Sequence, residues 1–189
     1  MLTAIRHHWV SEEEYLRRER EALDKSEYYA GAILAMAGGR LSHNRMCSAV
    51  TVTLGMQLRG RRCQPYSSDQ RLMTPGRLYT YPDLAVYRGQ VEPRPGTTDV
   101  ATNPTVLVEV LSDSTREYDT GDKLQAYQQI PSLQHVLLVE PDEVAVTVVS
   151  RENDAWSATR LTRRDAVVRL PAIGVEFPLS ELYADLLPQ

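Results

Sequence analysis

The chain has 189 residues, of which 42% are hydrophobic and 24% charged, and its formal net charge is −4. This composition is typical of one globular domain, and the negative charge argues against non-specific coating of nucleic acid, which needs a basic surface. No apolar run reaches the ~18 residues that a membrane helix needs, and Arg6, His7 and His8 interrupt the only apolar residues that could start a secretory signal. Two cysteines, Cys47 and Cys63, are too few for a disulfide framework, so we expect a cytoplasmic protein with no membrane partner.

Two helices and a bent strand are expected in the first third of the chain. Ser11, followed by three glutamates, has the pattern of a capping box, and a charged helix should follow to about Asp24. Gly31 lies between two apolar stretches, which predicts a strand with a bend or a tight hairpin. Apolar residues recur at helical spacing over 41–59, so a second helix is expected there, with Cys47 as a small core residue.

Short strands alternate with helices in the rest of the chain. They are expected at 63–66, 69–74, 78–87, 105–111, 135–140, 144–150 and 156–161. A surface loop should occupy 92–104, which is rich in Pro, Gly and Thr. Asp119 could cap a helix that ends near Gln129, and 180–187 should form a short terminal helix. This order fits an α/β sandwich around a mixed β-sheet.

Asp83 and Glu109 each introduce a charge into a segment expected to be a strand. Segment 105–111 is otherwise almost continuous Val and Leu, which is typical of a strand covered on both faces. A charge there is costly unless it is paired or binds a metal, and Mg²⁺ prefers carboxylate oxygens. Two carboxylates from neighbouring strands could therefore bind one such ion. Either acid alone could instead mark a solvent-facing strand end, an interpretation that is weaker for Glu109 because it lies inside the apolar run.

Lys123 is one of only two lysines in the chain and lies in the first turn of an expected helix, where the helix dipole disfavours a cation. Its ammonium could approach a phosphate oxygen or an attacking water, with Tyr127 packing against it from the next turn. It could equally be a solvated lysine paired with Asp119 one turn earlier. His43, at the start of the second helix, could carry a proton or contact a phosphate, although a capping or surface role is the commoner one.

Eight short segments in a fixed order match those of a known family. They are Glu27 to Ile33, His43 to Arg45, Asp69 to Leu72, Tyr81 to Val86, Val108 to Ser112, Ser114 to Asp119, Lys123 to Tyr127 and Leu138 to Pro141. On these residues the sequence resembles the Uma-type family of restriction endonucleases, within the PD-(D/E)xK nuclease-like superfamily. The resemblance implies a restriction-endonuclease-like fold, a mixed β-sheet core flanked by helices, in a single domain over 1–189. Within it we expect an N-terminal helical region at 1–26, a nuclease-like core at 27–140, and C-terminal strands with a short helix at 141–189.

The same resemblance implies an endonuclease that depends on Mg²⁺ or Mn²⁺ and hydrolyses phosphodiester bonds in DNA. Asp83 and Glu109 would bind the metal, with Glu27 as an accessory acid. Lys123 would orient the attacking water or neutralise the phosphate, and His43 would assist in the site. A homodimer is expected by analogy with nucleases that cut two strands.

The chain departs from the superfamily at one position. Two residues after the strand glutamate, where the superfamily usually has lysine, this chain has Leu111, and in the Uma-type family the lysine has moved to the following helix, here Lys123. This departure and the acidic net charge favour an alternative, a catalytically inactive nuclease-fold protein that binds nucleic acid or a partner protein. A hydrolase of small phosphoesters is a further alternative. The clearest basic patch for substrate contact is Arg59, Arg61 and Arg62.

Overall fold

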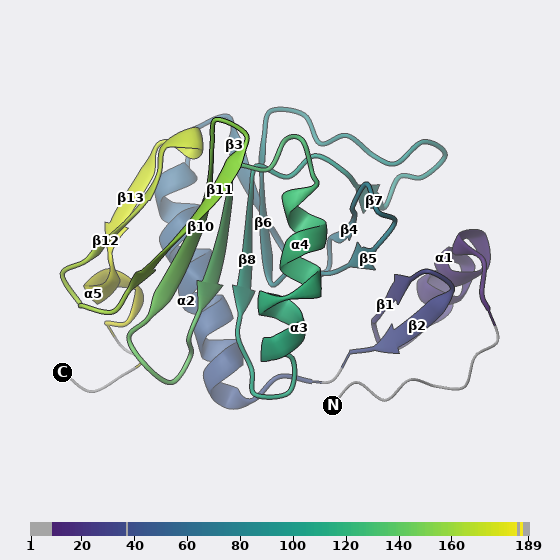
Figure 1. The fold of residues 1–189 in the computed structure, drawn as a ribbon, viewed down its shortest axis with the longest axis horizontal. Helices are drawn as coiled ribbons and strands as arrows, with labels where there is room; N and C mark the ends of the chain where they lie inside the picture. The colour runs from purple at the N-terminus through teal and green to yellow at the C-terminus, as the bar shows by residue number, and fades with distance from the viewer. Residues whose placement is uncertain (1–8, 37, 185, 187–189) are drawn as a thin grey trace.

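Helices and short strands alternate along the described part of the chain, residues 9–36, 38–184 and 186 of the computed structural model (Figure 1). The helices are α1 (Glu12–Glu21), α2 (Leu41–Leu58), α3 (Arg116–Thr120), α4 (Asp122–Gln128) and α5 (Leu179–Leu182), with the 3-10 helix η1 (Pro171–Ile173). The strands are β1 (Ser26–Tyr29), β2 (Ala32–Ala35), β3 (Cys63–Ser67), β4 (Arg71–Met73), β5 (Tyr79–Thr80), β6 (Leu84–Arg88), β7 (Val100–Ala101), β8 (Val106–Val110), β9 (His135–Val139), β10 (Val146–Glu152), β11 (Ala155–Leu161), β12 (Val167–Leu170) and β13 (Val175–Pro178). None of the described helices is long and apolar enough to cross a membrane.

A six-stranded mixed sheet forms the centre of the molecule, in the order β11-β10-β9-β8-β6-β3. Its β8 and β9 strands pair in parallel and the other pairs are antiparallel. Helix α2 covers one face of this sheet, and α3 and α4 lie over the other (Figure 1). A second sheet, in the order β2-β1-β5-β4-β7, lies beside it, and β12 and β13 form a separate hairpin. The expected α/β architecture with a mixed sheet is confirmed.

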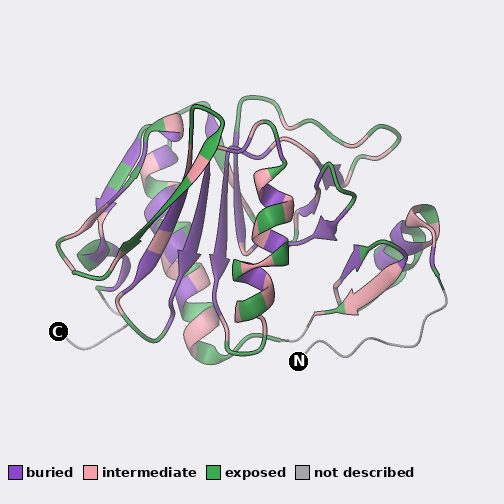
Figure 2. Ribbon diagram, in the orientation of Figure 1, coloured by how far each residue is buried: buried purple, intermediate pink, exposed green. Residues whose placement is uncertain are grey.

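Strand β8 explains why segment 105–111 is almost continuously apolar. Val108 and Val110 belong to the core under α2, whereas Leu107 and Leu111 belong to the core under α4, so both faces of the strand are buried (Figure 2). Side chains alternate between the two faces of a strand. Glu109 therefore points to the α4 face, where it is buried.

The hairpin and cap expected near the N-terminus are confirmed. The Ser11 hydroxyl accepts a hydrogen bond of 3.2 Å from the amide of Glu14 at the start of α1. Ala30 and Gly31 connect β1 to β2 with φ angles of 49° and 89°. A two-residue hairpin turn with positive φ at both positions matches the twist of the paired strands.

The single strand expected over 78–87 is wrong, because the chain passes from one sheet to the other within this segment. β5 belongs to the five-stranded sheet and β6 to the six-stranded sheet. Pro82 has no amide hydrogen to donate to a ladder, so 81–83 cannot continue the strand. Asp83 consequently lies immediately before β6, at the crossing point between the two sheets.

The helix expected to begin at Asp119 is also different in the structure. Asp119 lies inside α3 and is buried, so it is not a cap, and Gly121 separates α3 from α4. A Cβ at Gly121 would lie 2.7 Å from the carbonyl oxygen of Glu117, closer than real Cβ contacts come. The absence of a side chain at this position thus allows the two short helices to follow one another closely.

Smaller differences lie in the loop and at the C-terminus. Segment 92–104 contains the short strand β7, which pairs in parallel with β4. The β12–β13 hairpin was not expected. The terminal helix expected at 180–187 is the shorter α5, and residues 185 and 187–189, like 1–8, lie outside the described residues.

Candidate active site

The ammonium group of Lys123 lies among three carboxylates. Its Nζ is 3.0 Å from Oε1 of Glu109, 3.2 Å from Oε1 of Glu27 and 3.4 Å from Oδ1 of Asp119. The acids come from β8, β1 and α3, and all four side chains are buried. We call these four residues the lysine cluster. The expected local pair of Lys123 with Asp119 is present, but the lysine is not solvated.

Hydroxyl groups hold the acids of the lysine cluster in place. Tyr127 donates a hydrogen bond of 2.6 Å to Oε1 of Glu109, and Tyr118 donates one of 2.7 Å to Oε2 of Glu27. The Thr80 hydroxyl donates to the other oxygen of Glu27. Buried charges are tolerated where such hydrogen bonds satisfy them. The Tyr127 ring centroid lies 5.9 Å from Nζ of the lysine, so this side chain packs beside the ammonium as expected.

Asp83 lies closer to the surface, together with two residues of α2. Its Oδ2 accepts a hydrogen bond of 2.8 Å from the amide of Val110 and lies 3.4 Å from Nε2 of His43. The Nδ1 of His43 lies 3.5 Å from Sγ of Cys47. The side chains of Asp83 and His43 are each 18% exposed. We call Asp83, His43 and Cys47 the histidine cluster.

The pairing of β6 with β8 brings the two clusters to neighbouring strands. Leu84 pairs with Val108 in an antiparallel arrangement. Asp83 comes just before Leu84 and Glu109 just after Val108, so the two acids lie at neighbouring positions on adjacent segments. The negative charge of Asp83 raises the pKa of Glu109, which places the two carboxylates within electrostatic range.

The pKa values of the lysine cluster reflect its burial. The pKa of Glu109 is raised to about 8, mainly by burial and also by the charges of Asp83 and Asp119, against the opposing effects of Lys123 and the Tyr127 hydrogen bond. Burial also opposes the charge on Lys123, but the neighbouring Glu109 and Glu27 outweigh it and raise the lysine pKa well above its ordinary value. The ammonium is thus charged at neutral pH, and burial makes Glu109 harder to ionise than an exposed carboxyl.

In the histidine cluster the shifts favour an ion pair. The hydrogen bonds of His43 with Asp83 and Cys47 raise the pKa of the imidazole to about 11. Burial opposes ionisation of Asp83, but the His43 hydrogen bond and charge and the Val110 amide outweigh it and lower the pKa of that carboxyl. At neutral pH the imidazole therefore carries a positive charge beside an ionised Asp83.

The donor set of Asp83 and Glu109 fits a hard divalent cation. Glu109 uses Oε1 for its contacts with Tyr127 and Lys123, and Asp83 uses Oδ2 for its contacts with Val110 and His43. The second oxygen of each carboxylate accepts none of these bonds and can face an ion. Four carboxylates also outnumber the two cations of the clusters, and the charges of Asp83 and Asp119 add to burial in raising the pKa of Glu109. An ion of the Mg²⁺ type would neutralise this surplus of negative charge.

Glu27 is less suited to the same role. Both of its oxygens accept hydrogen bonds, from Thr80 and Tyr118, and Oε1 also contacts Lys123. Within the described residues, three ligand atoms lie within 4.8 Å of one another only in the histidine cluster, so Glu27, Asp83 and Glu109 do not form such a group. The metal-binding role of Glu27 stays a prediction.

A cavity of about 290 Å³ opens beside the histidine cluster. His43, Leu111 and Ser112 line it, and so do Arg40 and Arg116. The two arginines are paired with acids that also line the cavity, Arg40 with Asp113 at 2.9 Å and Arg116 with Glu140 at 2.7 Å. Of the residues in the two clusters, His43 is the one that lines this cavity.

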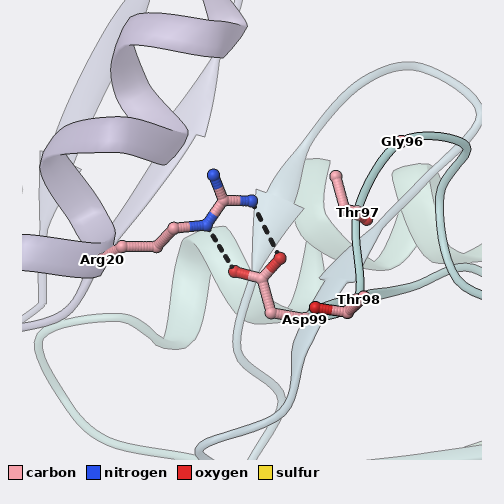
Figure 3. A pocket seen from close by; sticks show the side chains of 5 residues that line it. All are labelled: Arg20, Gly96, Thr97, Thr98 and Asp99. Atoms are coloured by element: carbon pink, nitrogen blue, oxygen red, sulfur yellow. Dashed lines mark hydrogen bonds and ion pairs between the residues drawn. The ribbon is translucent and has the colours of Figure 1, made fainter.

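A larger cavity of about 670 Å³ lies elsewhere (Figure 3). Two parallel hydrogen bonds of 2.9 Å join Arg20 of α1 to Asp99 at its wall. Its lining includes no residue of either cluster. We interpret it as a surface hollow bordered by an ion pair that ties α1 to the loop before β7.

The basic patch expected to contact substrate lies away from the clusters. Arg59, Arg61 and Arg62 follow the C-terminal end of α2, whereas His43 lies at its start. A helix of 18 residues is about 27 Å long. Arg61 also donates to the carbonyl oxygens of Ile173 and Gly174, so it secures the turn after η1.

Several residues of the site were missed in the sequence. Asp119 lies four positions before Lys123, a spacing that indicated the contact but not its burial. Cys47 lies four positions after His43, the spacing of neighbours on a helix face, so it contacts the imidazole as well as the core where the sequence predicts only a core position. The contacts of Tyr118, Arg40 and Arg116 could not be predicted, because their partners are distant in sequence.

The sequence comparisons identify the family. A family model named Uma2 and described as "Putative restriction endonuclease" matches residues 12–180, which include both clusters. The chain belongs to the Uma2 family. Two relatives of this family member come from Synechocystis sp. (strain ATCC 27184 / PCC 6803 / Kazusa). "Uncharacterized protein slr1290" is 33% identical over 180 residues, covering 94% of this chain and 93% of the relative. "Uncharacterized protein sll1609" is 32% identical over 157 residues, covering 82% and 89%.

A crystal structure described as "a putative nuclease belonging to DUF820", from Anabaena variabilis ATCC 29413, has the same fold. Its TM-score with the Uma2 family member is 0.74 at 19% sequence identity, and the match covers 93% of this chain and 98% of that one. At this identity the likeness shows the fold alone. The expected restriction-endonuclease-like fold and the family resemblance are both confirmed.

Proposed function

We propose that this Uma2 family member is a divalent-metal-dependent endonuclease that hydrolyses phosphodiester bonds in DNA. The observation that supports it most is the position of Asp83 and Glu109 on adjacent strand segments, one residue beyond the paired Leu84 and Val108, with the ammonium of Lys123 at 3.0 Å from Glu109. The family description and the fold of the Anabaena protein point to the same class of reaction.

In this proposal Asp83 and Glu109 hold Mg²⁺ or Mn²⁺. The bound ion would lower the pKa of a coordinated water and stabilise the charge that develops on the scissile phosphate. Lys123, fixed by its carboxylates, would orient the attacking water or neutralise a phosphate oxygen. Glu27 would keep the ammonium in position and stay a candidate accessory ligand. In the reaction a water oxygen would bond to phosphorus as the P–O bond to the leaving oxygen breaks, the water's proton would pass to solvent, and the leaving oxygen would take a proton from solvent.

His43 would meet the substrate at the entrance to the site. Its imidazole, charged below a pKa of about 11, suits a contact with a phosphate oxygen better than abstraction of a proton. Arg40 and Arg116 of the neighbouring cavity would flank the same strand of DNA. Many nucleases cut two strands by pairing two subunits, so we include a homodimer in the proposal by analogy.

The direct test is cleavage of plasmid DNA with Mg²⁺ or Mn²⁺ and with EDTA. We expect cleavage only with metal, and its loss in Asp83→Asn and in Glu109→Gln. Asp165→Asn is the matched control, because Asp165 is exposed and pairs only with Arg163 among the described residues. Cleavage that persists in both site variants would refute the assignment.

A second candidate is an inactive nuclease-fold protein that binds nucleic acid or a partner protein. Two observations favour it: the cavity beside the site has four acids against two arginines, and Lys123 is already neutralised by carboxylates. It predicts no cleavage with any divalent metal, while DNA or partner binding survives in Asp83→Asn. Hydrolysis of nucleotides or generic phosphodiesters, without cleavage of DNA, would instead indicate a hydrolase of small phosphoesters.

A further inference from the structure

We propose that the histidine cluster binds a thiophilic divalent cation such as Zn²⁺, and that this ion switches off the nuclease by withdrawing Asp83 from the Mg²⁺ site. The binding site stands on its own geometry, whereas the switch rests on the proposed function. One ligand atom from each of His43, Cys47 and Asp83 lies within 4.8 Å of the others. The three residues thus surround one point in space.

The chemistry of the three groups selects the ion. An imidazole, a thiolate and a carboxylate are ordinary ligands of Zn²⁺, whereas Mg²⁺ avoids sulfur. Zinc bonds of about 2.0–2.3 Å in a tetrahedron separate neighbouring ligand atoms by roughly 3.3–3.6 Å. One ligand atom from each residue lies within 4.8 Å of the other two, and His43 reaches Asp83 through Nε2 at 3.4 Å and Cys47 through Nδ1 at 3.5 Å, so small side-chain adjustments would bring one nitrogen and both partners to these separations. Water would complete the coordination.

The fold holds these ligands in position. His43 and Cys47 are four residues apart on α2, so they project from the same side of a rigid helix. The Val110 amide fixes the Asp83 carboxylate from behind, as outer-shell hydrogen bonds do in metal sites. The imidazole now presents Nδ1 to Cys47 and Nε2 to Asp83, so an ion would take one nitrogen and displace its proton.

An ion from solvent can reach the cluster. His43 lines the cavity of about 290 Å³, and the side chains of His43 and Asp83 are partly exposed. Because Asp83 belongs both to this site and to the proposed Mg²⁺ site, a zinc ion bound through Cys47 would compete for it. Zinc would therefore inhibit cleavage, and a chelator would restore it.

Titration of the full chain with Co²⁺ tests the site without reference to activity. We expect one equivalent to give a thiolate-to-cobalt absorption band in the near ultraviolet, absent in Cys47→Ser and retained in Cys63→Ser. Cys63 is the matched control, since it is the other cysteine of the chain and lies buried in the core. His43→Asn, which tests the second ligand independently, should weaken binding by about 10–100-fold. No thiolate band in the wild type, or the same band in Cys47→Ser, would overturn the proposal.

Cleavage with Mg²⁺, measured with and without Zn²⁺, tests the switch. Each variant is compared with its own rate in the absence of zinc, and we expect half-inhibition of Cys47→Ser to need about ten times more zinc than the wild type. Equal zinc sensitivity of the two proteins would overturn the switch. A cobalt–thiolate band in a protein that cleaves no DNA would support the cation site and refute the proposed nuclease activity. Cleavage of DNA without the band would support the nuclease and refute the cation site.

Discussion

The lysine and histidine clusters lie at adjacent strands, but solvent reaches only one of them. The lysine cluster is enclosed between β8, β1, α3 and α4, and tyrosine and threonine hydroxyls fix its acids. The histidine cluster lies beside a cavity, with Asp83 held by a backbone amide. The difference indicates a division of roles. Changes in the enclosed cluster should cost stability as well as activity, whereas changes in the open one should mainly cost activity.

Removal of the buried ammonium should have the largest effect. Lys123→Met leaves three carboxylates without their cation, which typically costs about 3–5 kcal/mol of unfolding free energy, and cleavage should be lost as well. Urea unfolding and plasmid cleavage measure the two effects. Lys25→Met is the matched control, because the other lysine of the chain pairs with exposed Asp69 and should cost about 1 kcal/mol or less. Similar losses of unfolding free energy in Lys123→Met and Lys25→Met would contradict the structural role of the lysine cluster.

Asp83→Asn should separate activity from stability. The asparagine side-chain oxygen can still accept the Val110 amide, and His43 can release its proton once the carboxylate is gone, so the unfolding free energy should fall by only about 1–2 kcal/mol. Loss of the carboxylate should weaken Mn²⁺ binding, measured calorimetrically, and reduce cleavage about 100-fold or more. If Asp83→Asn lost as much unfolding free energy as Lys123→Met, the prediction would be contradicted, and Asp83 would be needed mainly for folding.

Stability should depend on pH through Glu109. Its pKa is raised from 4.5 to about 8 in the folded protein, so between these values the folded state keeps a proton that the unfolded state has released. The unfolding free energy contributed by this group therefore falls as the pH rises through that window. Comparison of urea unfolding from pH 5 to 8.5 should show a steeper fall in the wild type than in Glu109→Gln. Saturating Mg²⁺ should reduce the difference by replacing the proton, and identical slopes without metal would contradict this prediction.

Tyr127→Phe removes no charge, so it should destabilise the fold less than Lys123→Met does. It removes the hydroxyl that donates to Glu109 and costs about 1–3 kcal/mol of unfolding free energy, since the acceptor remains buried. Tyr118→Phe, which removes the hydrogen bond to Glu27 at a less buried position, should cost less. Urea unfolding of the two variants measures these losses of unfolding free energy. A larger loss in Tyr118→Phe would contradict the prediction and mean that Glu109 is more accessible to solvent than Glu27.

Much of this arrangement was visible in the sequence because it follows from local pattern. Glu109 stands out as a charge within an apolar run, Lys123 as a scarce residue type at an unfavourable helix position, and Ser11 as a cap. The remainder depends on contacts between distant segments. The passage of the chain between sheets at Pro82, and with it the turn of Asp83 toward α2, follows from which strands pair, and a single stretch of sequence does not carry that information.

The lysine cluster should also be disrupted by a substitution at Gly121, a residue that carries no charge. A methyl group there would meet the carbonyl oxygen of Glu117, so α4 would have to move relative to α3. Because Lys123 follows two residues later, Gly121→Ala would displace the ammonium from its carboxylates while leaving every charge of the protein in place. The position of Lys123 among its carboxylates thus depends on the absence of a side chain at Gly121.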